Sequence, residues 1–203
     1  FNIPGAKTED VMHFTTKSEM KDFYIQAGVP VARYTFCKSV EEDLKFIEEV
    51  GYPVVVKPNV GVGAAATYKI KCEEDLRNFY KVGFQVPYIM EEFINAEIYT
   101  YDAIINSKGE PLFEAGNVTP FSLMDVVNNK DNSVYYIVKE LKDDVREVGR
   151  RTVASFGVKS RFVHFEFFRL LSDHEGLGKK GDVMALEVNM RPAGGFTPDL
   201  FNY

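Results

Sequence analysis

The C-terminal part of the sequence holds the pattern that most restricts the fold, two strand-like segments separated by a loop-like one. The segments FVHFEFFRL and MALEVNMRP are rich in aromatic and branched residues, which favour β-strands, and SDHEGLGKKG between them has the Gly and Asp typical of a loop. The pattern predicts a β-hairpin. Because alternate side chains of a strand share a face, Glu187, Asn189 and Arg191 should point one way and the apolar residues between them into a core.

The first strand of the predicted hairpin has its own alternating set, His164, Glu166 and Phe168. If the hairpin closes symmetrically about residues 176–177, Glu166 lies opposite Glu187, with the two Cβ atoms roughly 5 Å apart. Two carboxylates at that separation repel each other, so they need either a cation between them or a raised pKa.

A metal ion would account for this pairing of charges. Carboxylate and amide oxygens are hard ligands that suit Mg²⁺ and also Mn²⁺, so Glu166, Glu187 and Asn189 are candidate metal ligands. Arg191 adds a planar donor for a phosphate or carboxylate group. The same residues would also suit a solvent-facing hairpin in which Arg191 pairs with a surface glutamate.

Composition and charge limit the class of protein. The chain has 203 residues, of which 45% are hydrophobic and 27% charged, so it can bury a core as one large domain or two small lobes. A net charge of -6 without a basic run argues against a nucleic-acid partner. No apolar stretch reaches the ~18 residues of a membrane span, so we expect a cytoplasmic protein.

Two further features concern cysteines and the chain ends. Cys37 and Cys72 lie far apart, outside any CxxC or Cys/His cluster, so neither a disulfide framework nor a zinc site is predicted. The sequence starts without Met and ends at FNY directly after a loop, so we expect a piece of a larger protein. The oligomeric state stays open, and a homo-oligomer is among the options.

Helix and strand signals alternate along the chain and predict an α+β fold of two lobes. Helices are predicted at residues 18–27, 40–50, 73–82 and 140–156. Strands are predicted at residues 29–36, 52–58, 68–71, 88–94, 97–105 and 111–119, followed by the C-terminal hairpin. The lobes are expected to comprise residues 1–91 and 92–203.

Lys57 closes an apolar strand and precedes a loop that contains Gly61 and Gly63. Small residues let backbone N–H groups approach phosphate oxygens, and the lysine adds a positive charge. The loop is not a Walker A motif, because the GK[ST] ending is missing and no helix follows at once. A plain turn between two strands is the alternative interpretation.

The segment IMEEFI places two adjacent carboxylates on an apolar strand between the lobes, a position that suits a hinge contacting a base edge. Glu97 begins the next strand and could accept hydrogen bonds from ribose hydroxyls, and Phe168 could reach an adenine. Solvated edge charges and core packing are the alternatives. His13, His164 and His174 show no metal or triad spacing and receive no catalytic role.

Taken in order, these segments resemble the ATP-grasp superfamily. The similarity covers about residues 15–197 and includes Lys17 before AGVPV, GYPVVVKP, the small-residue loop, IMEEFI, Glu97, HFEFF and LEVNMRPAGG. The resemblance implies two α+β lobes with antiparallel sheets that hold ATP between them. It also implies transfer of the γ-phosphoryl group of ATP to a carboxylate, followed by attack of an amine on the acyl-phosphate.

The resemblance also implies roles for individual residues, beginning with the nucleotide. Lys17 and Lys57 would contact the phosphates beneath a lid at residues 59–67, and Glu91 with the backbone of Phe93 and Ile94 would meet the adenine edge. Glu97 would hold the ribose.

For the reacting end, Glu166, Glu187 and Asn189 would bind Mg²⁺, and Arg191 would stabilise the transferred phosphoryl group or hold the acceptor carboxylate. The acceptor and the amine are expected to be small molecules.

Two positions depart from the family pattern. Thr16 stands where an aspartate often precedes the first lysine, and Ala64, Ala65 and Ala66 stand in the lid where glycine and hydroxyl residues are common. The leading hypothesis is a carboxylate-amine ligase. The alternatives are bicarbonate activation, as in biotin carboxylase or carbamoyl-phosphate synthase, and a regulatory module that binds nucleotide without turnover.

Overall fold

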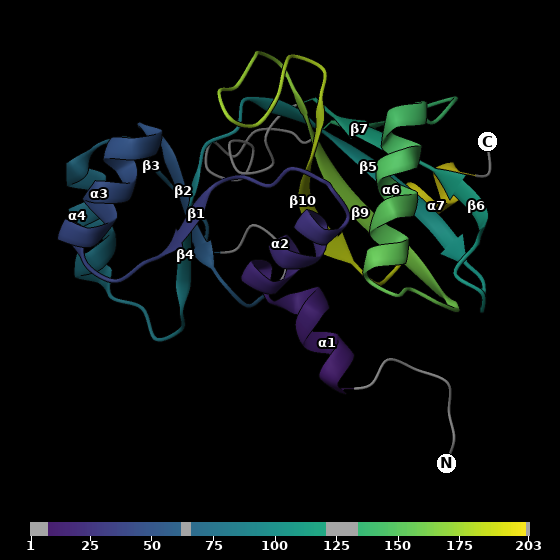
Figure 1. The fold of residues 1–203 in the computed structure, drawn as a ribbon, viewed down its shortest axis with the longest axis horizontal. Coiled ribbons are helices and arrows are strands. Elements are labelled where there is room, and N and C mark those ends of the chain that lie inside the picture. Colours follow the sequence, from purple (N-terminus) through teal and green to yellow (C-terminus); the bar gives the residue numbers. More distant parts are fainter. Residues whose placement is uncertain (1–7, 62–65, 121–133, 202–203) are drawn as a thin grey trace. The chain divides into compact units, whose positions relative to one another are not determined.

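The computed structural model of the chain describes residues 8–61, 66–120 and 134–201. These residues form two compact units, unit 1 within Phe1–Val31 and Asn95–Tyr203 and unit 2 within Ala32–Ile94, and Figure 1 shows the elements of each. Each unit has one antiparallel sheet with packed helices, so the expected α+β class is confirmed. Within the described residues no helix has the length and hydropathy needed to cross a bilayer.

Unit 2 consists of a four-stranded sheet in the order β1-β4-β2-β3 and two helices. Its elements are β1 Tyr34–Phe36, α3 Val40–Val50, β2 Val54–Pro58, β3 Tyr68–Ile70, α4 Glu73–Val82 and β4 Tyr88–Glu92. The Ser39 hydroxyl caps α3 by accepting a hydrogen bond from the Glu42 N–H at 3.2 Å. Ile47 from α3 and Leu76 from α4 pack with Val54 in the core of this unit.

Unit 1 is built on a six-stranded sheet in the order β10-β9-β5-β7-β8, with β6 paired to β5. Its strands are β5 Ala96–Ile105, β6 Pro111–Ala115, β7 Asn117–Thr119, β8 Tyr136–Ile137, β9 Arg161–Leu170 and β10 Val183–Asn189. Its helices are α1 Thr8–Thr15, α2 Lys17–Gln26, α6 Asp143–Ser155 and α7 Thr197–Leu200.

Helices α2 and α6 share one hydrophobic core with a single face of this sheet. Tyr101 of β5 and Phe165 of β9 are fully buried there, together with Tyr24 of α2 and Val145 of α6. Gly149 allows α6 to approach β5 closely, because a Cβ atom at this position would lie 2.3 Å from Cγ of Tyr101. The opposite face of the sheet carries Glu166, Glu187 and the residues paired with them.

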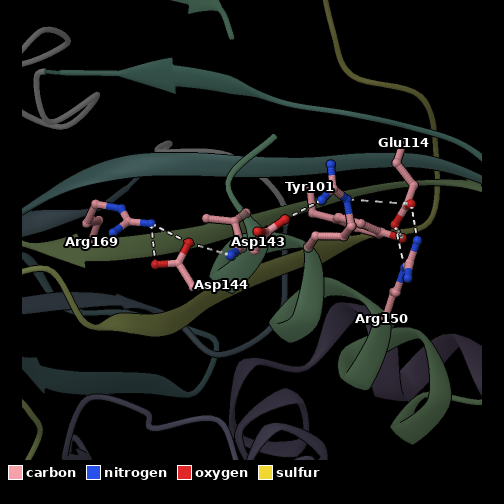
Figure 2. A network of polar contacts seen from close by, with 8 residues as sticks. Tyr101, Glu114, Asp143, Asp144, Arg150 and Arg169 are labelled. Atoms are coloured by element: carbon pink, nitrogen blue, oxygen red, sulfur yellow. Dashed lines mark hydrogen bonds and ion pairs between the residues drawn. The ribbon is translucent and has the colours of Figure 1, made fainter. Parts of the chain in front are cut away.

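Ion pairs connect α6 to the strands that it covers (Figure 2). At the start of the helix, both carboxylate oxygens of Asp144 accept hydrogen bonds from Arg169 of β9 at 2.7 Å. Further along, Arg150 donates to Glu114 of β6, which also accepts a hydrogen bond from the Tyr101 hydroxyl at 2.8 Å. These contacts set the helix in one position along the sheet.

The observed division of the chain into two units differs from the expected two lobes in its N-terminal residues. The expected boundary near residue 91 lies close to the observed one after Ile94, but residues up to Val31 group with the second half of the chain. The reason is packing, because Met20 and Tyr24 of α2 are buried in the core of unit 1. The predicted strand 29–36 is also shorter, since only Tyr34–Phe36 is paired.

Candidate functional site

The hairpin of β9 and β10 brings the two predicted carboxylates together. Glu187 is the cross-strand partner of Glu166, as predicted, and Asn189 is the partner of His164. The predicted symmetric closure was wrong in detail, because Val183 pairs with Arg169 and a β-bulge follows between Ala185 and Glu187. Continuing the first register without the bulge would place Glu187 opposite Phe165, so the bulge decides which face the carboxylate takes.

Four cross-strand rows lie side by side on the sheet face opposite α2 and α6. The carboxylate row consists of Thr100, Glu166 and Glu187. The imidazole row next to it consists of Asp102, His164 and Asn189. The apolar row beyond the imidazole row consists of Phe113, Ile104 and Phe162. The Phe168 row, on the other side of the carboxylate row, consists of Ile98, Phe168 and Met184.

His164 connects the imidazole row to the carboxylate row. Its Nδ1 lies 2.7 Å from Oδ1 of Asp102, and its Nε2 lies 3.2 Å from Oε1 of Glu166. Burial disfavours the imidazolium, but the hydrogen bonds and negative charges of Asp102 and Glu166 outweigh burial and raise the pKa of His164 to about 9. The ring is therefore positively charged at neutral pH and donates to both carboxylates.

Two further hydrogen bonds hold Asp102, the partner of this histidine, in place. The Thr100 hydroxyl donates to Oδ2 of Asp102 at 2.5 Å and accepts from the backbone N–H of Asn117 at 2.9 Å. Sequence analysis gave His164 no role, since its spacing to other ligands along the chain is uninformative. The signal lay in the pairing of β5 with β9, which sets Asp102 directly opposite His164.

Within the described residues no three His, Cys, Asp or Glu side chains form a metal cluster by themselves. The candidate ligand set is therefore two carboxylates and the Asn189 amide, which supplies only oxygen atoms to a cation. Such a set fits a hard ion that takes its remaining ligands from water or phosphate. Arg191 lies two residues after the end of β10, and its exposed guanidinium donates to the carbonyl oxygen of Pro192 at 2.9 Å.

The remaining candidates in unit 1 lie on three elements. Lys17 is the first residue of α2, and Thr16 before it is buried, with a hydroxyl that has no hydrogen-bond partner among the described residues. Glu97 lies near the start of β5, in register with Arg169. Phe168 is half-buried and shares the face of Glu166, as predicted.

In unit 2 the predicted residues form a buried ion pair. Nζ of Lys57 lies 2.6 Å from Oε2 of Glu91, with the two side chains 12% and 8% exposed. Their strands are neighbours, because Val55 of β2 pairs with Glu91 of β4 and Lys57 follows two residues later on the same face. The ion pair was not predicted from the sequence, because it depends on the pairing of β2 with β4, which are not consecutive strands.

The other acidic residue of IMEEFI is also paired rather than solvated. Glu92 accepts hydrogen bonds from the Arg33 backbone N–H at 2.6 Å and from its guanidinium at 2.7 and 2.9 Å. The alternative of solvated edge charges was therefore wrong for both glutamates. Next along the chain, Ile94 is buried and the Phe93 ring lies 4.1 Å from Nζ of Lys69.

The predicted phosphate loop is described only in part. Gly61 has a φ of 134°, which favours glycine, and Asn59 before it is buried. Gly63, Ala64 and Ala65 lie outside the described residues, so the lid stays a prediction.

The chain is similar to enzymes that use ATP. The family model of the carbamoyl-phosphate synthase L chain, ATP binding domain, matches residues 16–108. The D-alanine--D-alanine ligase B of Clostridium perfringens is 31% identical over 171 residues, which cover 81% of this chain and 53% of that ligase. The L-arginine-specific L-amino acid ligase of Bacillus subtilis is 25% identical over 211 residues, which cover 96% of this chain and 47% of that ligase.

A solved structure agrees with this similarity at the level of the fold. The ADP complex of an N5-carboxyaminoimidazole ribonucleotide synthetase matches with a TM-score of 0.72 at 16% identity, over 94% of this chain and 49% of that chain. The chain thus spans about half the length of the proteins it matches.

Proposed function

We propose that this chain belongs to the ATP-grasp superfamily and is the ATP-binding part of a ligase that transfers the γ-phosphoryl group of ATP to a carboxylate. The observation that carries this proposal is the carboxylate row, in which Glu166 and Glu187 lie opposite each other across one sheet face. Positioning and charge neutralisation supply most of the catalysis in phosphoryl transfer, and this face offers both.

The proposed reaction has two steps. A carboxylate oxygen of the acceptor attacks the γ-phosphorus, the bond to the β-phosphate oxygen breaks, and ADP leaves. An amine then attacks the carbonyl carbon of the acyl-phosphate, loses a proton to solvent and displaces inorganic phosphate. The names of the relatives make amino acids reasonable first candidates for both substrates. The cytoplasm is the proposed compartment, since such a ligase consumes ATP.

Glu166, Glu187 and Asn189 would hold Mg²⁺ or Mn²⁺. When bound, the ion would neutralise charge on the phosphate oxygens. The protein's own contribution is orientation, because the imidazolium of His164 donates to Glu166 and so fixes the direction of that carboxylate. His164 also offsets part of the negative charge that the carboxylate row would otherwise concentrate.

Cationic residues would bind the phosphate groups. Lys57 is held by Glu91, which keeps its ammonium in one place, and Lys17 is placed at the positive end of α2. Arg191 would contact the transferred phosphoryl group or the acceptor carboxylate.

Glu91 and the backbone of Phe93 and Ile94 would meet the adenine edge, which puts Lys57 beside the phosphate nearest the nucleoside. Glu97 would accept hydrogen bonds from the ribose, and Phe168 would pack against the base. The loop around Gly61 would cover the phosphates.

Calorimetric titration with ATP in the presence of Mg²⁺ tests the proposal. Glu187→Gln keeps the shape of the side chain and removes its charge, so we expect ATP affinity with Mg²⁺ to fall at least about tenfold. Glu175→Gln in the exposed β9–β10 loop is the matched control and should bind like wild type. Equal affinities for wild type and Glu187→Gln would contradict the metal assignment.

Bicarbonate activation is the second candidate function. It is favoured by the match of residues 16–108 to the ATP-binding domain of the carbamoyl-phosphate synthase L chain. The discriminating measurement is ADP release by the full-length protein with bicarbonate as the only acceptor. Bicarbonate-dependent release that amino acids do not increase would replace the first proposal with this one.

A further inference from the structure

A pocket of about 210 Å³ opens on unit 1, on the same sheet face as the carboxylate row. Its walls include the whole apolar row, Phe113, Ile104 and Phe162. Pro198 and Phe201, from α7 and the residue after it, line another side, and the rings of Phe113 and Phe201 lie 6.0 Å apart. None of the residues proposed to bind the nucleotide or the metal ion lines this pocket.

The chemistry of the pocket wall favours an apolar occupant. Among the described residues that line it, Asp102 is the only charged one, and both of its oxygens already accept hydrogen bonds, from His164 and Thr100. The aromatic walls are unusually accessible, since Phe113 and Phe162 are 40% and 48% exposed while Phe165 on the other face is fully buried. Large apolar side chains that line a recess with few polar groups are typical of a ligand pocket.

The size of the pocket suits a single apolar side chain. A cavity of about 150 Å³ lined by Leu, Ile and Phe holds benzene. A volume of about 210 Å³ therefore accepts a branched aliphatic group or a phenyl ring.

The pocket lies on the same strands as the carboxylate row, where the reacting end of ATP is proposed to bind. Along β9, Phe162, His164 and Glu166 share a face, so the apolar row lies about 13 Å from the carboxylate row at ~3.3 Å per residue. Pro192 and Ala193, which directly follow Arg191, also line the pocket. The Phe168 row, proposed to contact adenine, lies on the far side of the carboxylate row. Base, phosphates and pocket would thus follow one another along the strands.

We infer that this pocket binds the apolar side chain of the acceptor, whose carboxylate is phosphorylated at the carboxylate row. The inference rests on the proposed function and adds a substrate class to it: amino acids or related acids with a branched aliphatic or phenyl group. Charged side chains are disfavoured, because the described residues of the pocket wall offer them no free charged partner and burial without one is unfavourable.

The test measures carboxylate activation by the full-length protein with ATP, Mg²⁺ and hydroxylamine, which attacks the acyl-phosphate and forms a hydroxamate. The acceptors are alanine, leucine, phenylalanine, glutamate and lysine, with phenylacetate as an acid that lacks the amino group. We expect kcat/KM for leucine or phenylalanine to exceed that for alanine at least about tenfold. A preference for glutamate or lysine would overturn the inference.

Two variants link this preference to the pocket. Ile104→Phe fills it and should reduce the preference for leucine over alanine at least about fivefold, with ATP affinity unchanged. Leu112→Phe, on the neighbouring position of β6 and 70% exposed, is the matched control and should behave like wild type. Phe162→Ala enlarges the pocket and should shift the preference toward phenylalanine.

Failure of the inference and failure of the proposed function give different results. An unchanged preference in both pocket variants, while hydroxamate still forms, would overturn the inference. No hydroxamate from any acid, or loss of Mg-dependent ATP binding in the wild-type protein, would instead overturn the proposed function.

Discussion

His164 is the residue on which the geometry of the carboxylate row depends, because its imidazolium contacts both Asp102 and Glu166. Asp102 is almost fully buried, with a side chain 4% exposed. Removing a cation from a buried pair leaves the other charge uncompensated, which typically lowers the free energy of unfolding by about 3–5 kcal/mol.

His164→Gln should therefore destabilise the protein by about 3 kcal/mol in urea unfolding, and Asp102→Asn in the same chain should recover part of the loss. His174→Gln, in the β9–β10 loop, is the control for the loss of an imidazole and should change stability by less than about 0.5 kcal/mol. A His164→Gln variant as stable as wild type would show that this histidine is neutral in the folded protein.

Tyr24 of α2 offers a second test at the residue scale. Its hydroxyl is buried without a hydrogen-bond partner among the described residues, and burial with the nearby Glu187 and Glu166 charges raises its pKa well above the usual value. Tyr24→Phe should therefore increase the free energy of unfolding by about 1 kcal/mol, since it removes an unsatisfied polar group.

Tyr101→Phe is the matched comparison for Tyr24→Phe. The Tyr101 hydroxyl donates to Glu114 at 2.8 Å, so its removal should decrease stability by about 1 kcal/mol. If both variants were destabilised equally in thermal unfolding, Tyr24 would have a partner in solution.

Among the elements, helix α6 approaches the sheet closely at Gly149, which packs against the ring of Tyr101. Gly149→Ala would push a methyl group into the buried ring of Tyr101 and should lower stability by about 1–3 kcal/mol. Gly194→Ala places the same methyl group where nothing lies within 4 Å, so it controls for the substitution itself. Equal unfolding midpoints for the two variants would mean that α6 can shift along the sheet.

The elements also show what the sequence could predict. The bounds predicted for α3 and α4 agree with the observed ones. For α3 the signals are local, namely the helical spacing of its apolar residues, the Ser39 cap and Gly51 at its end. The pairing of Glu166 with Glu187 was predicted as well. The bulge that produces this pairing was not, because a bulge depends on packing of both strands and leaves no fixed sequence signal.

The role of His164 and the ion pair of Lys57 with Glu91 were not predicted, because both depend on contacts between distant segments. His164 gains its role from Asp102, 62 residues away, and Lys57 meets Glu91 through pairing of β2 with β4. The described residues 8–31 group with the second half of the chain rather than with the first for the same reason, since nothing local in α2 indicates which core it joins.

At the scale of the whole molecule, each unit has its own hydrophobic core. We therefore expect that one unit can be destabilised without the other. Leu76 is fully buried in unit 2, and Leu76→Ala should remove about 2–5 kcal/mol from that unit. In hydrogen exchange measured by mass spectrometry, β2 and β4 should lose protection while β5 and β9 keep theirs. Equal loss in all four strands would show that the two units unfold as one.

We propose that Glu166, Glu187 and Asn189 hold the metal ion of a metal-nucleotide complex. Electron paramagnetic resonance of Mn²⁺ tests this most directly, because free and bound Mn²⁺ give separate signals. With ATP present, the wild-type chain should bind one Mn²⁺, and Glu166→Gln and Glu187→Gln should each weaken binding about 10–100-fold while Glu175→Gln does not. Mn²⁺ binding that is the same in wild type and in both carboxylate variants would contradict the account.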